Sequence, residues 1–383
     1  MDFRLTTEQR SFQQEVASFI SGGLPAGWDR EHASLAEGLV VERDIMRRLA
    51  AKHWLALPWP KEVGGLSASP MQQLIFNELM AYRRVPGTVN MGVAWVGPVV
   101  MLYGTDQQKA EYLSGIASGE QLWCTLYSEP GAGSDLAAMQ TRAVRDGDDF
   151  VINGQKIWTT FGHYADWGWL ACRTDPNAPK HKGLSTFAVK MDSPGINVRP
   201  LVNMTGGHEF NEIFFEDVRV PASQMIGEEN RGWYNVAVGL DFERSSIGAT
   251  SSARRTVDEL VAHVAARRDS VPKAVRHRLV DAAVSTQVLR NMAYKIATEQ
   301  EKTGIAPNRE AQMAKLFGAE LQQKIGAVAI QIFGLEGQAS HAGTVAHRQQ
   351  YGFLRTVANT IEGGTSEIQR SVIATRGLGL PRE

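Results

Sequence analysis

The sequence predicts an α+β protein in three sections: an N-terminal α-helical domain at 1–120, a central β domain at 121–230, and a C-terminal α-helical domain at 231–383 built as a four-helix-type bundle. Three observations support this prediction. Apolar residues recur at helical spacing in the first section, short alternating segments bounded by turn residues replace them in the second, and the helical period then returns. The length of 383 residues suits two or three domains.

The first section opens with a helix signal. Thr6 and Gln9 have the spacing of a capping box, and one helical face follows in Phe12, Val16, Phe19 and Ile20. The segment 58–65, Pro-Trp-Pro-Lys-Glu-Val-Gly-Gly, predicts a rigid turn without a chemical role.

The central section reads as short strands. The run 150–152 leads into Asn153-Gly154 and continues at 156–158, which predicts a β-hairpin turning at Asn153-Gly154. Alternation at 167–171 and 187–191 predicts further strands. The last strand is expected at 212–220, where Pro221 stops it.

The third section returns to helical periodicity from Trp233 to about Arg376. Pro272 and the segment 304–307, Gly-Ile-Ala-Pro, interrupt it. Four or five long helices are therefore expected.

Composition excludes several classes of function. Forty Lys and Arg residues face 41 Asp and Glu residues, so no basic field for nucleic acid is expected. Two cysteines, Cys124 and Cys172, form no disulfide framework and fit a reducing compartment, and Cys124 lies in an apolar run typical of a core thiol. The N-terminus lacks an apolar signal region, and the most apolar segment, 93–102, is too short to cross a bilayer. We expect a cytoplasmic protein without a membrane partner or a metal site.

Two neighbouring segments carry the strongest functional signal. Tyr127-Ser-Glu-Pro-Gly-Ala-Gly-Ser-Asp is followed, about twenty residues later, by Asn153-Gly-Gln-Lys-Ile-Trp-Thr-Thr. Proline fixes one backbone angle, while Gly131 and Gly133 permit angles closed to other residues, so this loop could approach a flat ligand closely. Each segment alone would indicate only a turn or a hairpin. Together, at this spacing, they are far more specific.

These segments resemble the flavin-contacting part of the acyl-CoA dehydrogenase family. The resemblance continues in family order through NEIFFEDVRVP (211–221), GEENRGW (227–233), QIFGLEG (331–337) and EGGTSEIQR (362–370). It implies an acyl-CoA dehydrogenase-like fold, FAD as cofactor, and oxidation of an acyl-CoA thioester to the 2,3-enoyl-CoA in lipid β-oxidation. Electrons would leave to an electron-transfer flavoprotein. No GxGxxG segment follows a strand, so no Rossmann site is predicted.

The resemblance also assigns flavin contacts. They fall on Tyr127, Ser128, Gly133, Ser134, Trp158, Thr159, Thr160, Gln331, Gly334, Thr365 and Glu367. Gln331 and Gly334 match positions that the family uses across a subunit interface, which implies a homotetramer or a heterotetramer with a homologous subunit. The Arg-x-x-Phe-Gly motif that holds the FAD diphosphate in many members is missing here. Arg267 and Arg268 are the nearest candidates, although an arginine pair is more often a solvated helix end.

The predicted reaction needs a base for the substrate α proton, and the chain offers two carboxylates. Many members carry a Glu directly before Gly-Thr-Ser, but here an extra glycine places Gly363 at that position and Glu362 one residue away. Glu243 instead occupies a slot in the apolar helical stripe of Val236, Leu240 and Ile247, where a carboxylate is costly unless it is paired or used.

The resemblance favours Glu243 as the catalytic base. The branch of the family that acts on branched-chain and long-chain acyl groups carries its base at this helix position, directly before an Arg that Arg244 matches. Asp241 has the spacing to pair with Arg244. Ser134, Asp241 and Arg244 are accordingly expected to contact the substrate, and a structural ion pair between Glu243 and an arginine is the alternative.

Two further functions stay open from the sequence. One is a flavin oxidase or monooxygenase of the same fold, which would release hydrogen peroxide or oxygenated product. The other is a non-catalytic subunit that completes the FAD site of a homologous partner, as the missing Arg-x-x-Phe-Gly motif allows. The segments 59–65 and 378–382 look like those of bacterial members that act on bulky or sterol-derived acyl-CoAs.

Overall fold

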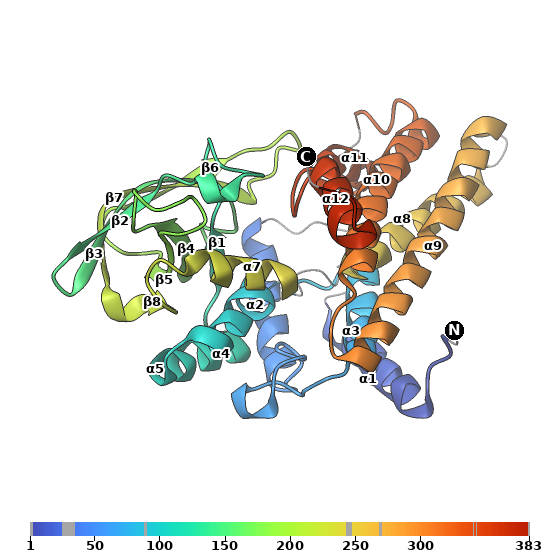
Figure 1. Cartoon of the computed structure of the whole chain (residues 1–383). Helices are drawn as coiled ribbons and strands as arrows, with labels where there is room; N and C mark the ends of the chain where they lie inside the picture. Colours follow the sequence, from blue (N-terminus) through green and yellow to red (C-terminus); the bar gives the residue numbers. More distant parts are fainter. Residues whose placement is uncertain are drawn as a thin grey trace. The chain divides into compact units, whose positions relative to one another are not determined.

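The computed structural model describes residues 3–24, 35–87, 90–242, 247–267, 270–339, 341 and 343–381. For residues 35–39, 240–242 and 247–249 it describes the backbone alone. The chain divides into two compact units (Figure 1). We call them the helical unit, which comprises Met1–Ile45, Ala68–Thr88 and Arg244–Glu383, and the sheet unit, which comprises Met46–Ser67 and Val89–Glu243.

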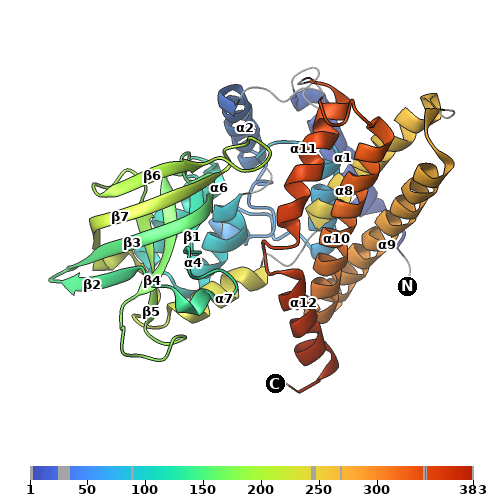
Figure 2. The same cartoon turned by 90° about the horizontal axis from the view of Figure 1, so that it is seen from above.

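The helical unit is built on long helices. Its elements are α1 (Thr7–Gly23), most of α2 (Leu35–Ala50), α3 (Pro70–Tyr82), α8 (Ile247–Ala266), α9 (Lys273–Thr303), α10 (Asn308–Phe333), α11 (Val345–Asn359), α12 (Ser366–Val372) and a last π-helical turn (Ile373–Gly377). Helices α8 to α11 surround one core that includes Leu260, Leu289 and Ala329 (Figure 2). The predicted C-terminal helical bundle is confirmed.

The predicted helix boundaries are also confirmed. Thr6 and Gln9 form a reciprocal capping box at the start of α1. Helix α9 begins directly after Pro272 and ends at Gly304, whose φ of 73° is the left-handed conformation that favours glycine at a helix end. Helix α10 then starts after Pro307.

The sheet unit contains one mixed sheet. Its strands are β1 (Trp123–Leu126), β2 (Arg142–Asp146), β3 (Asp149–Thr160), β4 (Trp167–Arg173), β5 (Leu184–Lys190), β6 (Ile196–Leu201), β7 (Phe210–Pro221) and β8 (Met225–Ile226). They follow the order β6-β7-β3-β2-β4-β5-β8, with β1 paired to β4. Short helices complete the unit: η1 (Lys61–Val63), η2 (Gly92–Val96), α4 (Gly97–Tyr103), α5 (Asp106–Gln108), η3 (Lys109–Leu113), α6 (Ser114–Ser118), η4 (Leu136–Ala138), η5 (Ala222–Gln224) and α7 (Gly232–Phe242).

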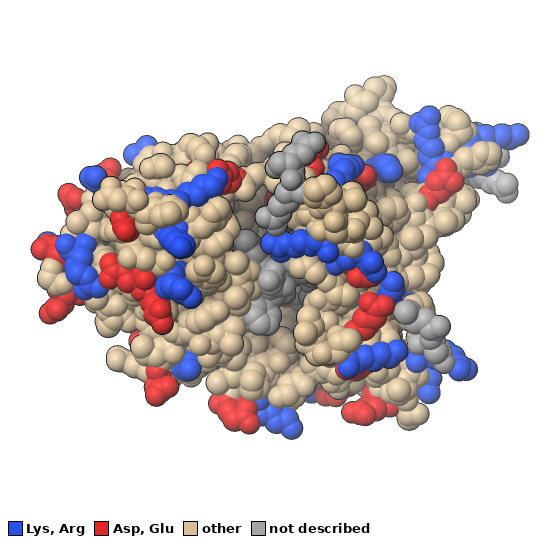
Figure 3. Space-filling view, in the orientation of Figure 1, with Lys and Arg blue, Asp and Glu red and all other residues tan. Residues whose placement is uncertain are grey.

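Both faces of the central strands are covered. One core, with Ile152 and Phe187, is built from strand residues, and a second, with Trp169 and Leu113, joins strands to the short helices. Cys124 and Cys172 are fully buried, and burial raises the pKa of each thiol to about 12, as expected of core thiols. On the face shown in Figure 3, acidic and basic side chains are interspersed over the sheet unit.

The hairpin predicted at Asn153-Gly154 is wrong. Strand β3 continues through this dipeptide, and the chain turns earlier, at Gly147-Asp148, where Asp146 pairs with Asp149. The dipeptide instead lies opposite a bulge in β7, because between the pairs Ile152–Val218 and Gly154–Phe215 the chain advances two residues in β3 and three in β7. A Cβ on Gly154 would lie 2.6 Å from Thr141 Oγ1. Glycine at this position therefore lets the chain around Thr141 pack closely against β3.

A smaller difference concerns the end of the sheet. The strand expected to be last, at 212–220, is β7, and the two-residue strand β8 follows it after Pro221. Within the described ranges, no helix is both long and apolar enough to cross a membrane.

Candidate functional site

The two segments singled out in the sequence lie against each other in the sheet unit. The Ile157 amide donates to the Ser128 carbonyl at 2.9 Å, which joins β3 to the chain directly after β1. Ser128 and Thr160 are half-buried, and Ser134 is exposed on the loop between them. The structure therefore places Ser128 beside the end of β3 that carries Trp158 and Thr160.

Trp158 has the backbone and exposure of a ligand-contacting residue. Its φ is 61°, a left-handed conformation that is strained for a bulky side chain, and its side chain is 55% exposed. The ring meets Phe210 edge-on, with the ring centroids 5.9 Å apart. The pairing of β3 with β7 shifts between Lys156 and Thr159, so the strain coincides with a second bulge. Bulges of this kind re-aim side chains beside active sites.

The loop after Glu129 is open. Glu129 and Ala132 exchange two backbone hydrogen bonds of 3.0 Å, which close a tight turn. Neither Gly131 nor Gly133 has a positive φ, so the predicted need for angles closed to other residues is wrong. A Cβ at either glycine would meet nothing within 4 Å. These glycines keep space free in front of the backbone, which is what close approach of a flat ligand requires.

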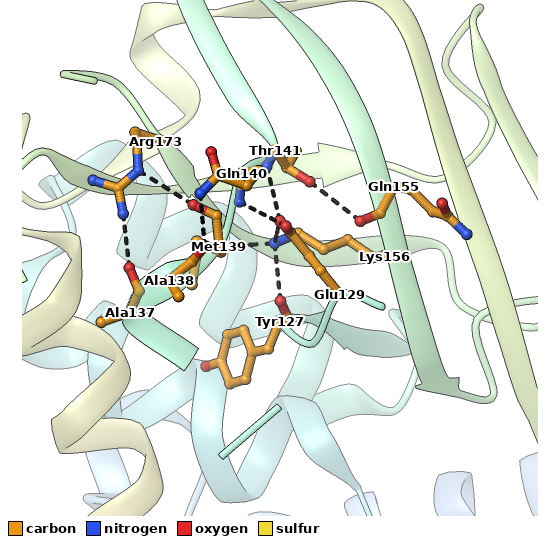
Figure 4. Close-up of polar contacts among 10 residues, drawn as sticks. All are labelled: Tyr127, Glu129, Ala137, Ala138, Met139, Gln140, Thr141, Gln155, Lys156 and Arg173. Atoms are coloured by element: carbon orange, nitrogen blue, oxygen red, sulfur yellow. Dashed lines mark hydrogen bonds and ion pairs between the residues drawn. The ribbon is translucent and has the colours of Figure 1, made fainter. Parts of the chain in front are cut away.

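A buried ion pair that the sequence analysis missed joins the two segments (Figure 4). Lys156 Nζ lies 2.8 Å from Glu129 Oε1 and donates to the Tyr127 carbonyl at 2.9 Å. The backbone amides of Gln140 and Thr141 also donate to the Glu129 carboxylate, at 2.6 and 2.9 Å. Burial raises the pKa of Glu129, but Lys156 and these donors outweigh it and lower the pKa overall.

Strand alternation could have revealed this pair. Phe150, Ile152 and Lys156 point to the same face of β3, and the first two are core residues. A lysine on a buried strand face requires a partner carboxylate, and the neighbouring segment offers two, Glu129 and Asp135.

A second polar cluster lies at the end of the same strand. The fully buried Asn211 amide donates to the Thr159 carbonyl at 3.0 Å and to His163 Nδ1 at 2.9 Å, while its oxygen accepts from His208 Nε2 at 3.1 Å. The two imidazoles stack with centroids 4.3 Å apart. Nδ1 of His163 accepts a hydrogen bond, so this nitrogen carries no proton and the ring is neutral. Burial and the adjacent His208 lower the pKa of His163, which also favours the neutral ring.

A cavity of about 500 Å³ opens beside this cluster. Its walls come from the chain between β3 and β4, the end of β5, and β6, and they include His163, His208 and Asn211. The predicted flavin contacts are not among its walls. The cavity nevertheless adjoins the end of β3, because its wall residue Asn211 donates to the Thr159 carbonyl.

The remaining predicted contacts lie in the helical unit. Gln331 is exposed near the end of α10 and accepts a 2.7 Å hydrogen bond from Arg278 of α9, a residue that the sequence analysis missed. Gly334 caps α10 with φ 57°. Thr365 caps α12 by accepting from the Ile368 amide. Glu367 is exposed, and hydrogen bonds from its own backbone amide and from the Thr365 hydroxyl lower its pKa.

The two base candidates differ in what can be described. Glu243 and Arg244 lie outside the described residues, as does Arg268, and the side chain of Asp241, in the last turn of α7, lies outside them as well. Arg267 donates to His263 on the surface of α8. Glu362 is held by a fork of two 3.1 Å hydrogen bonds from Arg355.

The turn around Glu362 is built on glycine. Gly363 and Gly364 have φ values of 62° and 91°, both in the left-handed region. A side-chain-bearing residue would be strained at Gly363, the position that alignment gives to the alternative base. This turn therefore holds Glu362 in a surface ion pair, and a carboxylate-bearing residue in place of Gly363 would be strained.

Comparison with known proteins identifies the architecture. Three family models match in order: acyl-CoA dehydrogenase N-terminal domain at residues 6–120, middle domain at 124–218 and C-terminal domain at 230–378. Two Mycobacterium tuberculosis proteins are similar along their length. Acyl-CoA dehydrogenase IpdE1 is 38% identical, covering 93% of this chain and 91% of its own, and acyl-CoA dehydrogenase FadE29 is 34% identical, covering 99% and 98%.

Solved structures agree. The Tcur3481-Tcur3483 steroid ACAD matches with a TM-score of 0.89 and 34% identity over 100% of both chains. The ChsE4-ChsE5 complex from Mycobacterium tuberculosis matches with a TM-score of 0.86 and 33% identity, again over 100% of both chains.

Proposed function

This chain belongs to the acyl-CoA dehydrogenase family, and from that premise we propose that it oxidises the Cα–Cβ bond of a bulky, steroid-derived acyl-CoA. The family consists of FAD-dependent oxidoreductases, so FAD is the cofactor. The observation that carries the flavin site is the open loop after Glu129, joined through Ser128 to β3 beside the strained, exposed Trp158. The substrate class is proposed from the similarity to the solved steroid ACAD.

The residues present fit a flavin. The 55% exposed indole of Trp158 offers an apolar wall, and the loop after Glu129 leaves room for a flat ring. Thr159 is buried, and its hydroxyl has no hydrogen-bond partner among the described residues, so it is available to a bound group. We assign the isoalloxazine contacts to Tyr127, Ser128, Gly133, Ser134, Trp158, Thr159 and Thr160. We assign the adenosine side of FAD to Gln331, Gly334, Thr365 and Glu367 of the helical units.

Arg278 extends this assignment to the diphosphate. It donates to Gln331 at 2.7 Å, so a guanidinium stands beside a predicted FAD contact although the Arg-x-x-Phe-Gly motif is missing. Arginine matches phosphate oxygens with a fixed fork of donors. We therefore place Arg278, ahead of Arg267, at the diphosphate.

The chemistry assigned to the protein is proton removal and substrate orientation. Bound FAD supplies the hydride acceptor. Glu243 takes the substrate α proton, and Asp241, Arg244 and Ser134 orient the thioester. Glu362 is kept out of this role by its ion pair with Arg355. A base within a desolvated pocket has its pKa raised toward neutrality, which suits proton abstraction.

The proposed partners are a homologous subunit and an electron-transfer flavoprotein. Val280, Val284 and Val288 form an exposed stripe on α9, with side chains 59%, 60% and 46% exposed at i, i+4 and i+8. An apolar helix face of this kind suits a subunit interface. Related solved assemblies pair two different chains, as their titles state, which favours a heteromer over a homotetramer.

A turnover screen with the purified chain, alone and with a co-expressed homologous subunit, tests the proposal. We expect a yellow, FAD-containing protein that reduces an electron-transfer flavoprotein with steroid acyl-CoAs faster than with short linear acyl-CoAs. Stoichiometric hydrogen peroxide would instead identify an oxidase. FAD binding without turnover of any acyl-CoA would identify a non-catalytic subunit, and a colourless preparation under all conditions would refute the proposal.

A further inference from the structure

The ion pair between Glu129 and Lys156 is an expensive feature of the sheet unit. The Lys156 side chain is 0% exposed and that of Glu129 is 7% exposed, so both charges have lost their hydration. Three N–H groups point at the Glu129 carboxylate, from Lys156, Gln140 and Thr141, which means that it is ionised. Apolar side chains of similar volume often stabilise such a site equally well, so retention of the charges calls for another reason.

The position of the pair supplies one. Lys156 makes the last regular pair with β7, at Ile213, before the register shift that contains Trp158. Its ammonium also holds the Tyr127 carbonyl, at the start of the open loop. The pair thus ties together the two chain segments at the points where each becomes irregular (Figure 4).

From this placement we infer that Glu129 and Lys156 are positioning residues for the flavin. Their ion pair sets the spacing between the loop 127–135 and the indole of Trp158, and it keeps the backbone of Trp158 in its left-handed conformation. Strained backbone persists only where its surroundings over-determine it, and a directional, buried contact one residue away from the bulge does this. The inference rests on the proposed function in taking these segments as the flavin contacts.

Three variants test it. Lys156→Met removes the charge and keeps the chain length, while the double variant Glu129→Gln/Lys156→Met leaves no unpaired buried charge. Val220→Ala is the matched control, because Val220 is 1% exposed in the same sheet and pairs with Phe150 at the far end of β3. All measurements are made below the melting temperature. The first is the exchange of the Ile157 and Ala132 amide protons in FAD-free protein. The second is FAD binding, followed by the dissociation constant and by the visible circular dichroism of the flavin.

We expect the amide protons of Ile157 and Ala132 to exchange about tenfold faster or more in both ion-pair variants, and to the same extent at the two positions. Both variants should also bind FAD at least about tenfold more weakly and show altered circular dichroism of the flavin. The control Val220→Ala should have a lower melting temperature, but its amide exchange rates and FAD dissociation constant should stay within about twofold of wild type. If the double variant behaves like the control, the pair is merely structural and the inference is refuted. If Lys156→Met does not fold, the double variant decides.

The exchange measurement separates this inference from the proposed function. Coupled loss of protection in a protein whose wild type binds no FAD would support the linkage between the segments and refute the flavin assignment. Independent exchange of the two segments would refute the linkage even in a protein that binds FAD normally.

Discussion

Replacing each candidate base by its amide distinguishes their roles. Glu243→Gln retains size and hydrogen bonding but removes basicity, so flavin reduction by substrate should fall about 10²–10⁴-fold, the contribution of a positioned general base. FAD should stay bound, and the acyl-CoA should still perturb the flavin spectrum. Glu362→Gln removes a carboxylate that is 45% exposed and bonded through both oxygens to Arg355. Such a partly exposed pair contributes about 1 kcal/mol or less to stability.

Flavin reduction in Glu362→Gln should therefore stay within about tenfold of wild type, a barrier change of roughly 1.4 kcal/mol at most. Glu320→Gln is the matched control, since Glu320 forms a similar surface ion pair with Arg370 in the same unit. Anaerobic rapid mixing gives the reduction rate, and thermal unfolding gives the stability. An inactive Glu362→Gln variant beside a normal Glu243→Gln variant would show that the base sits in the C-terminal turn and that our alignment of this turn is off by one residue.

Three further outcomes follow from the described contacts. Gly154→Val should cost about 1–3 kcal/mol in denaturant unfolding, because its Cβ would meet the Thr141 backbone at 2.7 Å, whereas Gly352→Ala, with open space around it, should not destabilise. His163 has its pKa lowered by burial and His208, so its stabilising effect is complete above the ordinary value of 6.5 and is lost as the pH falls; melting curves should show this loss, and His163→Gln should flatten it. Val284→Glu should dissociate the proposed oligomer in light scattering, and Val40→Glu, at a more exposed valine on α2 (71% against 60%), should leave it intact.

Much of the local structure was readable from the sequence because it depends on neighbouring residues. The capping box of Thr6 and Gln9, the break at Pro272 and the glycine end of α9 are set by the backbone chemistry of a few adjacent positions. The motif around Trp158 and the order of the sections were likewise sufficient for the family and its cofactor.

The tertiary structure decided what depends on partners distant in the chain. Asn153-Gly154 has the chemistry of a turn, yet pairing along β7 keeps it within β3, since the contacts of a twelve-residue strand outweigh a two-residue preference. Lys156 looked like an ordinary polar position until the fold placed Glu129 2.8 Å from it in the interior. The sequence alone determined which local structures were available and which chemistry they could serve. Only the tertiary fold decided which charges would be buried together, because the cost of burial depends on what the rest of the chain brings alongside.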